Sequence, residues 1–156
     1  MEILISESTR FMTHFAGARI LVVDDFQGWR EFVCSKLATV PGLEVIGQVS
    51  DGLEAVHKTK ELQPDLILLD IGLPTLNGIE VARRIREVSP ASKILFVSEN
   101  RSAGIAEEAL STGAGGYIVK SVAAFELLPA INTVLEGRRF VTNSLADHAI
   151  PLVDGV

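Results

Sequence analysis

A short, unbroken apolar run in the middle of the chain, Leu66-Ile67-Leu68-Leu69, constrains the fold more than any other segment. Pro64 precedes it, and Gly72 and Pro74 follow it, so the run has the length and the boundaries of a β-strand. A strand without polar alternation is buried on both faces, which is typical of a parallel sheet covered by helices. Asp70 directly follows the run, so its carboxylate is expected at the carboxyl end of a strand, where open α/β sheets bind their ligands.

Strand-like apolar runs alternate with segments of helical spacing along most of the chain. The expected strands are 19–25, 43–49, 65–70, 93–98 and 117–120, and the expected helices are 26–40, 53–62, 78–88, 102–112 and 125–136. This alternation predicts a parallel sheet with helices on both faces, joined by right-handed crossovers. Pro129 lies inside the last helical segment, so that helix is expected either to begin late or to be kinked there.

The length and the charge of the chain indicate one domain of the soluble globular class. Its 156 residues are enough for a single hydrophobic core with short extensions. We expect an N-terminal extension over 1–17, the domain over 18–137, and a C-terminal tail or the start of a linker over 138–156. The net charge of −6 argues against binding of nucleic acid through bulk charge.

The sequence contains no evident signal for export or for membrane insertion. No apolar run approaches the roughly 18 residues that a membrane-spanning helix needs, and Met1-Glu2 does not begin a signal peptide. Cys34 is the single cysteine and cannot form an internal disulfide, which fits a reducing compartment. A cytoplasmic protein without membrane contact is therefore expected.

Polar side chains end four of the predicted strands. Asp24 and Asp25 end the first strand, Asp70 ends the third, Ser98 the fourth and Lys120 the fifth. Because the carboxyl ends of parallel strands meet at the same edge of a sheet, we expect these side chains to converge.

Together these side chains predict a site for a metal ion and a phosphoryl group. Carboxylates held close together repel one another, and a hard divalent cation such as Mg²⁺, which prefers oxygen ligands, removes that repulsion. Lys120 and the Ser98 hydroxyl can bind phosphoryl oxygens. The central carboxylate, Asp70, can act as a nucleophile and form an acyl phosphate.

In their order and spacing, these motifs resemble those of the receiver domain of bacterial two-component response regulators. The resemblance covers about residues 19–137 and rests on Asp24-Asp25, on Asp70 within LLDIGLPTLNG, on Ser98, and on Tyr117-Ile118-Val119-Lys120. It implies an α/β flavodoxin-like (βα)5 fold, a three-layer sandwich whose parallel sheet has the strand order 2-1-3-4-5.

The resemblance also implies roles for the acidic residues and for the loop after Asp70. Asp70 would be the phospho-acceptor and a metal ligand, and Asp25 would bind Mg²⁺ directly. Asp24 would act on the metal largely through water, and the backbone carbonyl of Gly72 would be a further ligand.

The resemblance assigns the remaining strand ends to phosphoryl binding and to switching. Ser98 and Lys120 would bind the phosphoryl group, and Tyr117 would be the aromatic residue that turns inward when Ser98 moves. Phosphorylation would then shift the population of conformations, with a readout face made of helix 102–112, strand 115–119 and helix 125–136.

The expected phosphoryl donor is a sensor histidine kinase or a phosphotransfer protein, and a second copy of the chain is a further candidate partner. The segments GLEVIGQVSDGLEAV and GAGGYIVKS are closest to receivers that precede a LuxR-type helix-turn-helix, so transcription regulation is the expected output. No recognition helix is evident in 141–156, so DNA would be contacted only through an output domain absent from this chain. Self-phosphorylation and slow autodephosphorylation are the most catalysis expected, so the chain is not expected to be an enzyme.

Two other classes of function remain open. One is a receiver-like interaction module that does not use phosphorylation, and the unusual Glu99 supports it. The other is a phosphohydrolase that turns over an aspartyl phosphate. Haloacid-dehalogenase-like enzymes have a second Asp where this chain has Gly72, which argues against the phosphohydrolase.

Two positions depart from the receiver pattern. The residue after Ser98 is usually small, whereas this chain has Glu99 and then Asn100, and a carboxylate beside the pocket would oppose an incoming anion. We therefore hypothesise that Glu99 and Asn100, together with Gly72, set an unusual lifetime of the phosphorylated state. Ser121 follows Lys120 where many receivers have proline, which leaves open whether that peptide bond is cis.

Overall fold

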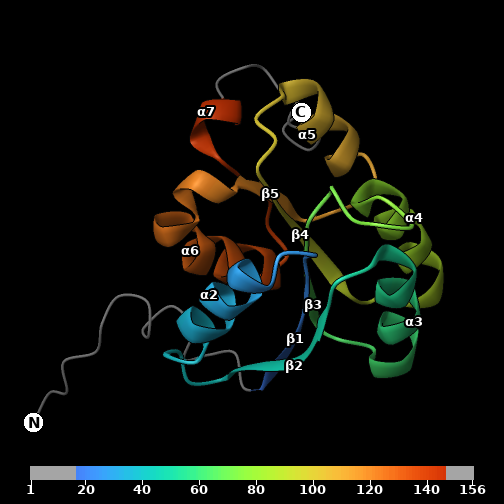
Figure 1. The fold of residues 1–156 in the computed structure, drawn as a ribbon. Coiled ribbons are helices and arrows are strands. Elements are labelled where there is room, and N and C mark those ends of the chain that lie inside the picture. The colour runs from blue at the N-terminus through green and yellow to red at the C-terminus, as the bar shows by residue number, and fades with distance from the viewer. Residues whose placement is uncertain (1–16, 147–156) are drawn as a thin grey trace, which may run out of the picture.

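The computed structural model describes residues 17–146, which form a central sheet between two layers of helices (Figure 1). Nearly all of the predicted N-terminal extension and the end of the predicted tail, 147–156, lie outside the described residues. Within 17–146, none of the helices has both the length and the apolar character needed to cross a lipid bilayer.

The sheet consists of parallel strands in the order β2-β1-β3-β4-β5-β6. The strands are β1 (Ala18–Val23), β2 (Leu43–Val49), β3 (Leu66–Leu69), β4 (Lys93–Ser98), β5 (Gly116–Val119) and β6 (Phe140–Val141). The order of the first five confirms the predicted flavodoxin-like fold. All four residues of β3 are buried, as its unbroken apolar sequence predicts.

Helices cover both faces of the sheet (Figure 1). One face packs against α2 (Gln27–Leu37) and α6 (Ala123–Leu135), and the other packs against α3 (Gly52–Leu62), α4 (Gly78–Val88) and α5 (Ala103–Leu110). In β1, Ile20 and Val22 belong to the first core, and Leu21 and Val23 belong to the second, because successive strand residues point to opposite faces. Each fully buried Ile or Leu contributes about 1.5–3 kcal/mol, so the strand ends are firmly positioned from both sides.

Helix α6 begins earlier than the sequence indicates. It starts at Ala123, directly after the 3₁₀ turn Lys120–Val122, so the prediction of a late start with Pro129 in the first turn is wrong. Proline cannot donate the helical hydrogen bond to the carbonyl four residues earlier, which here is Phe125. Phe125 is 82% exposed, so this turn of α6 lies at the surface, and the helix continues through Pro129 without that hydrogen bond.

The segment after α6 contributes a sixth strand that the sequence does not predict. β6 pairs in parallel with β5, and the four-residue helix α7 (Asn143–Ala146) follows it. Between them, the Thr142 amide donates a hydrogen bond to the Tyr117 carbonyl at 3.0 Å, and the Thr142 hydroxyl accepts one from the Val119 amide at 3.0 Å. Two residues are too few to show the alternation of a strand, so β6 cannot be recognised from the sequence pattern.

A close backbone contact joins the start of α3 to the loop after β3. The amide of Gly52 donates a hydrogen bond to the Pro74 carbonyl at 3.1 Å, and a Cβ atom at Gly52 would lie 2.0 Å from the Leu76 carbonyl oxygen. No side chain fits at that distance, so glycine is required at position 52.

We predict that Gly52→Ala lowers the free energy of unfolding by about 1–3 kcal/mol, because the added methyl group forces α3 away from the loop. Gly104→Ala in α5 is the matched control, since the nearest atom to its Cβ would be the Ser102 Oγ at 3.6 Å. The control should gain about 0.5–1 kcal/mol from better helix propensity. Urea denaturation measures both changes, and a Gly52→Ala protein as stable as the parent would contradict the contact.

Candidate functional site

The predicted site residues meet at the carboxyl edge of the sheet, in one cleft. Asp24 and Asp25 follow β1, Asp70 follows β3, Ser98 is the last residue of β4, and Lys120 follows β5. The cleft has a volume of about 510 Å³ and is lined by Asp25, Phe26, Asp70, Ile71, Gly72, Ser98, Glu99, Asn100 and Lys120. Asp24 lies beneath it and is almost fully buried.

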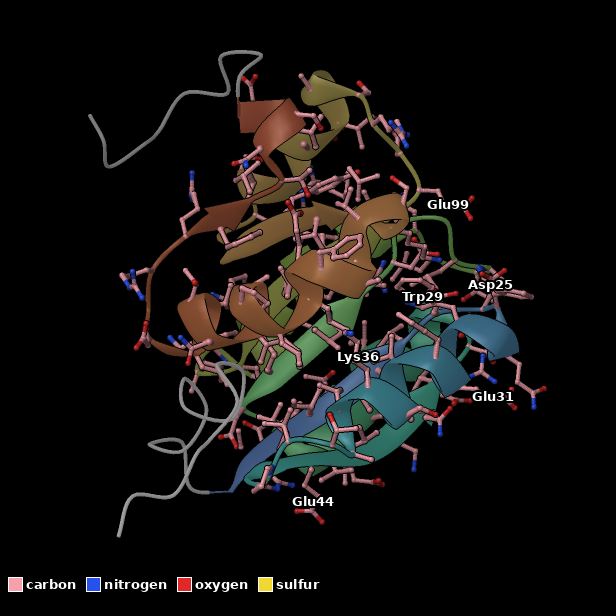
Figure 2. The ribbon with its side chains drawn as sticks, turned by 90° about the vertical axis from the view of Figure 1, so that its left-hand side faces the viewer. Asp25, Trp29, Glu31, Lys36, Glu44 and Glu99 are labelled. Atoms are coloured by element: carbon pink, nitrogen blue, oxygen red, sulfur yellow. The ribbon has the colours of Figure 1, made fainter. Side chains whose placement is uncertain are left out.

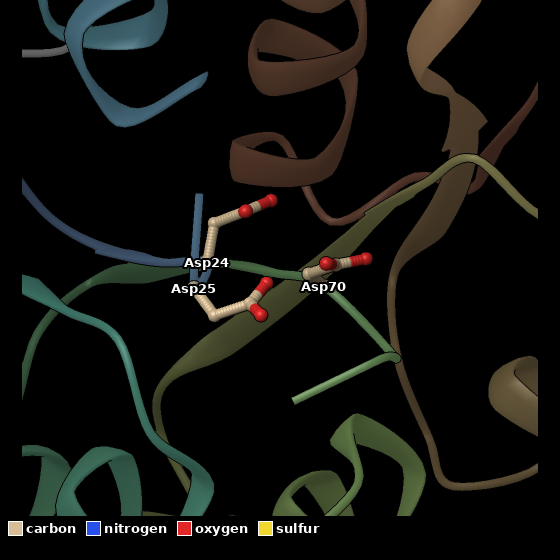
Figure 3. Close-up of side chains that lie close together, drawn as sticks. All are labelled: Asp24, Asp25 and Asp70. Carbon is tan, nitrogen blue, oxygen red and sulfur yellow. The ribbon is translucent and has the colours of Figure 1, made fainter. Parts of the chain in front are cut away.

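Three carboxylates gather between the ends of β1 and β3 (Figure 3). Asp24, Asp25 and Asp70 each offer one oxygen atom, and these three atoms lie within 4.8 Å of one another. Asp24 and Asp70 are buried, whereas Asp25 is exposed. The cluster therefore has a buried base and a side open to solvent, the arrangement that a partly hydrated hard cation needs.

Lys120 is the cation that faces this cluster. Its Nζ lies 2.6 Å from Asp24 Oδ2 and 3.5 Å from Asp70 Oδ2, and its side chain is 11% exposed. The ring of Trp29, from α2, has its centroid 5.0 Å from the same Nζ and adds a cation–π contact. One ammonium group cannot neutralise three carboxylates, so the described part of the site keeps an excess of negative charge.

Two hydrogen bonds from α2 and the residue before it hold Asp24 in place. The Phe26 amide donates a hydrogen bond to Asp24 Oδ1 at 2.9 Å, and the Arg30 guanidinium donates one to the Asp24 carbonyl at 2.8 Å. The other carboxylate oxygen, Oδ2, is buried and accepts no hydrogen bond from the described residues, so its contact there is the ion pair with Lys120. A buried oxygen with spare acceptor capacity suits a ligand or a ligand-bound water.

Burial and the neighbouring Asp24 charge raise the pKa of the Asp70 carboxyl above its ordinary value. The Lys120 ammonium and the Ile71 amide, which donates a hydrogen bond to Asp70 Oδ1 at 2.8 Å, both oppose this rise. Ionisation of Asp70 therefore costs the folded protein free energy, and Lys120 limits that cost.

Ser98 and Tyr117 are linked through the backbone of Asn100. The Asn100 amide donates a hydrogen bond to Ser98 Oγ at 3.0 Å, and the Tyr117 hydroxyl donates one to the Asn100 carbonyl at 2.8 Å. The Tyr117 ring is fully buried, and burial raises the pKa of its hydroxyl, an effect that the Ser98 interaction opposes. Here the predicted switch residue already lies inside the protein, and its movement with Ser98 stays a prediction.

The structure shows where Glu99 lies and which isomer precedes Ser121, the two positions that depart from the receiver pattern. Glu99 is exposed and lines the same cleft as Asp70, as the sequence leads us to expect. Figure 2 shows Glu99 on the same side of the molecule as Asp25. Among the described residues there is no cis peptide bond, so the bond between Lys120 and Ser121 is trans. Gly72 also lines the cleft, and a Cβ atom there would meet nothing within 4 Å, so space does not require glycine at this position.

Several residues that shape the site carry no motif in the sequence. Trp29 and Arg30 reach it from α2, and the Arg101 guanidinium donates a hydrogen bond to Ser121 Oγ at 2.8 Å, which links the loops after β4 and β5. Asn100 acts mainly through its backbone groups, which are the same for every residue type. A sequence pattern could not have identified these contacts.

Comparison with known proteins places these features in one family. The model of the response regulator receiver domain matches residues 20–132. The response regulator GacA of Pseudomonas viridiflava is 34% identical over 130 residues, 83% of this chain and 61% of GacA. The chemotaxis protein CheY of Thermotoga maritima is 36% identical over 118 residues, 76% of this chain and 98% of CheY.

Solved structures show the same similarity. A LuxR-family two-component response regulator from Aurantimonas sp. SI85-9A1 superposes with a TM-score of 0.81 at 35% sequence identity, over 85% of this chain and 94% of that chain. This chain spans about three fifths of the length of GacA and nearly all of the length of CheY.

The raised pKa of Asp70 predicts how stability depends on pH. A carboxyl whose pKa is raised on folding stabilises the protein fully below its unfolded-state pKa, and this contribution is lost as the pH rises through the folded-state pKa. Asp70→Asn cannot ionise, so we expect it to be more stable than the parent at neutral pH, by about 1.4 kcal/mol per unit of pKa shift. At about pH 3 the two proteins should be equally stable.

Urea denaturation across this pH range, in EDTA so that bound metal does not stabilise the parent, measures the difference. Glu44→Gln is the control, because Glu44 is an exposed carboxylate at the opposite end of the molecule (Figure 2). If Asp70→Asn is no more stable than the parent at neutral pH, or if its gain in stability grows as the pH falls, the Asp70 pKa is not raised.

Proposed function

This chain belongs to the family of response regulator receiver domains, and we propose that it is a phosphorylation-dependent signalling switch whose phospho-acceptor is Asp70. The observation that carries the proposal is the convergence of the Asp24, Asp25 and Asp70 carboxylates within 4.8 Å of one another, beside Lys120. A site of this composition can bind a cation and a phosphoryl group together.

The residues present fit Mg²⁺. The donor set is all oxygen, the exposed Asp25 leaves room for bound water, and the spare acceptor capacity of Asp24 Oδ2 suits a water ligand. We propose that Asp25, Asp70 and the Gly72 carbonyl bind the ion directly and that Asp24 acts through water. When bound, the ion would offset the negative charge of the carboxylates and of the phosphoryl oxygens.

The proposed transfer needs one bond to form and one to break. An Asp70 oxygen attacks the phosphorus of a phosphohistidine, the O–P bond forms, and the departing imidazole nitrogen keeps the electron pair of the broken N–P bond. Asp70 must be ionised to attack, which its burial opposes and Lys120 favours. Lys120 and Ser98 line the same cleft, so both can bind phosphoryl oxygens as these approach.

The contacts of Asn100 support a route from this site to α5. Its backbone joins Ser98 to Tyr117, and its side-chain Oδ1 accepts a hydrogen bond from the Ser102 amide at 2.8 Å, where Ser102 caps α5. A change at Ser98 would therefore reach the start of α5 through one residue. We propose that α5, β5 and α6 form the readout face.

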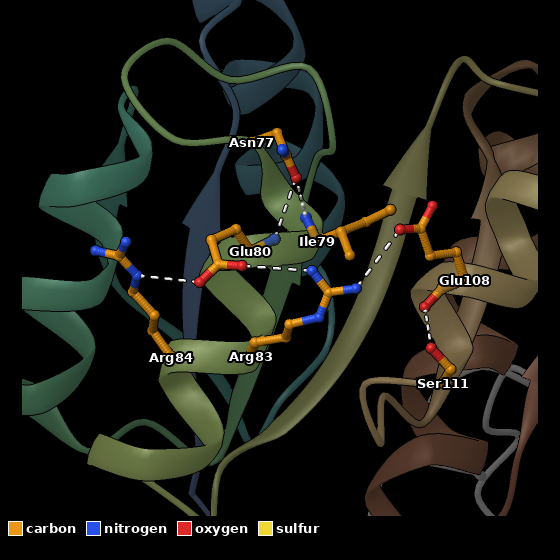
Figure 4. Close-up of polar contacts among 7 residues, drawn as sticks. All are labelled: Asn77, Ile79, Glu80, Arg83, Arg84, Glu108 and Ser111. Atoms are coloured by element: carbon orange, nitrogen blue, oxygen red, sulfur yellow. Dashed lines mark hydrogen bonds and ion pairs between the residues drawn. The ribbon is translucent and has the colours of Figure 1, made fainter.

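The ion pair between α5 and the neighbouring helix α4 is weak enough to permit a movement of α5. Across the α4–α5 boundary, Arg83 forms an ion pair with Glu108 at 3.5 Å, and Arg83 also contacts Glu80 of its own helix (Figure 4). The side chains of Arg83 and Glu108 are about half exposed. An exposed pair of this kind contributes roughly 0–1 kcal/mol, so breaking this ion pair adds little to the free energy needed to move α5.

The family also supports a proposal about partners. We propose a sensor histidine kinase or a phosphotransfer protein as the phosphoryl donor, and transcription regulation as the output. DegU of Brevibacillus brevis, 35% identical over 132 residues, is named a transcriptional regulatory protein. Contact with DNA would be made by a separate output domain, because the helices and strands of the described residues all belong to the receiver fold.

We predict that incubation with Mg²⁺ and acetyl phosphate adds one phosphoryl group per chain, as an acid-stable, base-labile adduct. Asp70→Asn should abolish it, and Asp25→Asn should lower the rate by tenfold or more because the proposed metal ligand is lost. Glu44→Gln, far from the cleft, should be labelled like the parent (Figure 2). Intact-mass spectrometry measures the extent of phosphorylation, and peptide mapping locates the phosphorylated residue.

The same experiment separates the alternatives. Stoichiometric labelling of Asp70 supports the receiver function. Absence of any adduct would favour an interaction module that does not use phosphorylation, and rapid multiple turnover of the donor would favour a phosphohydrolase. Labelling that persists in Asp70→Asn would refute the assignment of the acceptor.

We predict that Glu99→Gln speeds labelling by acetyl phosphate about two- to fivefold at low salt, because removing an exposed charge near the cleft removes roughly 0.4–1 kcal/mol of repulsion. The effect should shrink as the salt concentration rises. Glu107→Gln, an exposed carboxylate on α5, is the matched control. If the rates of formation and decay of the acyl phosphate are both unchanged in Glu99→Gln, Glu99 has no kinetic role.

A further inference from the structure

A second cleft lies at the amino edge of the sheet, opposite the site of Asp70. It has a volume of about 250 Å³, and four cationic side chains line it. These are Arg86 from the last turn of α4, Lys93 from the start of β4, and Arg138 and Arg139 from the connection between α6 and β6. We call it the basic cleft. No Asp or Glu among the described residues lines it.

Two of these cations have no counter-charge among the described residues. Lys93 and Arg139 are partly buried, and the side chain of neither makes a hydrogen bond or an ion pair within 17–146. Arg138 is the member with a carboxylate partner, Glu136. Partial burial removes water from a charged group, and none of the described carboxylates that could offset this lines the cleft beside Lys93 or Arg139. Such an excess of positive charge is unexpected in a chain whose net charge is −6.

Arg86 is held against the wall of the cleft with hydrogen-bonding capacity unused. One terminal nitrogen of its guanidinium donates to the Ser92 carbonyl, and its side chain passes close to Gly113, where a Cβ atom would lie 3.4 Å from Arg86 Cδ. Its Nε is buried and has no hydrogen-bond partner among the described residues. An unsatisfied buried N–H in the wall of a charged cleft indicates that an acceptor is missing.

We propose that the basic cleft binds a compact, multiply charged anion of the phosphate class, either inorganic or at the end of a small metabolite. Guanidinium groups match phosphate oxygens in geometry, and several cations in one cleft match an anion with more than one negative charge. The small volume fits one or two phosphoryl groups and excludes a polymer, which the overall negative charge of the chain would also repel. This site is independent of Asp70, since it lies at the other edge of the sheet and shares no lining residue with the first cleft.

Backbone NMR can test the proposal directly, because glycines 113, 115 and 137 line the basic cleft and Gly72 lines the cleft of Asp70. Pyrophosphate is titrated into ¹⁵N-labelled protein in EDTA, at constant ionic strength. We expect saturable shifts of the amide signals of the three glycines, with little change at Gly72. Shifts that do not saturate, or that are as large at Gly72, would overturn the proposal.

Substitutions then identify which cationic side chains bind the anion. Lys93→Ala with Arg139→Ala should weaken binding about tenfold or more, since each charge-assisted hydrogen bond contributes roughly 1.5–3 kcal/mol. Neither side chain has a hydrogen-bond or ion-pair partner in the part of the chain that the structure describes, so the fold should be kept, and a dispersed spectrum verifies this. Lys60→Ala, an exposed lysine of α3, is the control and should bind like the parent. Equal affinity of the double variant and the parent would refute the site.

Parallel titrations with inorganic phosphate and with ADP distinguish the sources of the anion. Equal affinity for pyrophosphate and ADP means that the phosphoryl groups alone are recognised. Tighter binding of ADP means that the cleft accepts a nucleotide, and both results support the proposal. Failure of all three anions to shift the glycine signals would overturn it.

Discussion

The site depends on the position of one ammonium group among three carboxylates. Asp24 and Asp70 are buried, and two buried negative charges so close together would destabilise the fold without Lys120, whose Nζ contacts both. The contact with Asp24 is shorter, at 2.6 Å, than the contact with Asp70, at 3.5 Å. Asp70 is therefore the less compensated of the two. The excess negative charge around it attracts a cation, and a bound cation would in turn attract the oxygens of a phosphoryl group.

The parallel sheet makes this arrangement possible because it brings distant segments to one edge. The strands that lead to Asp24, Asp70 and Lys120 are β1, β3 and β5, which are far apart in the chain. In the sheet β1 lies beside β3, and only β4, which ends at Ser98, separates β3 from β5. Cores on both faces hold those strands, so the charged ends have little freedom to separate. The same topology sets the basic cleft at the amino edge, and the two ends of the molecule thereby present opposite charge.

Much of the fold and of the site could be predicted from the sequence, because particular residues determine them. The strand before Asp70 has no polar residue, so its burial and its sheet type could be read directly, and the residues that end the strands then had to meet at one edge. The strand β6 is too short to show a period. Pro129 left open a late start or a kink of its helix, and α6 does not start late. The preference of Lys120 for Asp24, and the bridging by Asn100, depend on distances and backbone groups that no residue pattern encodes.

The pairing of β6 with β5 also bears on solubility. The sequence of β5, Gly-Tyr-Ile-Val, is buried throughout and carries no charge, which is the composition of a segment that pairs readily with other chains when its edge is free. β6 covers that edge, ends after two residues, and follows Arg138-Arg139, whose charges disfavour the approach of another strand. Cleavage after Gly137 would uncover β5 and convert a protected strand into a site of intermolecular aggregation.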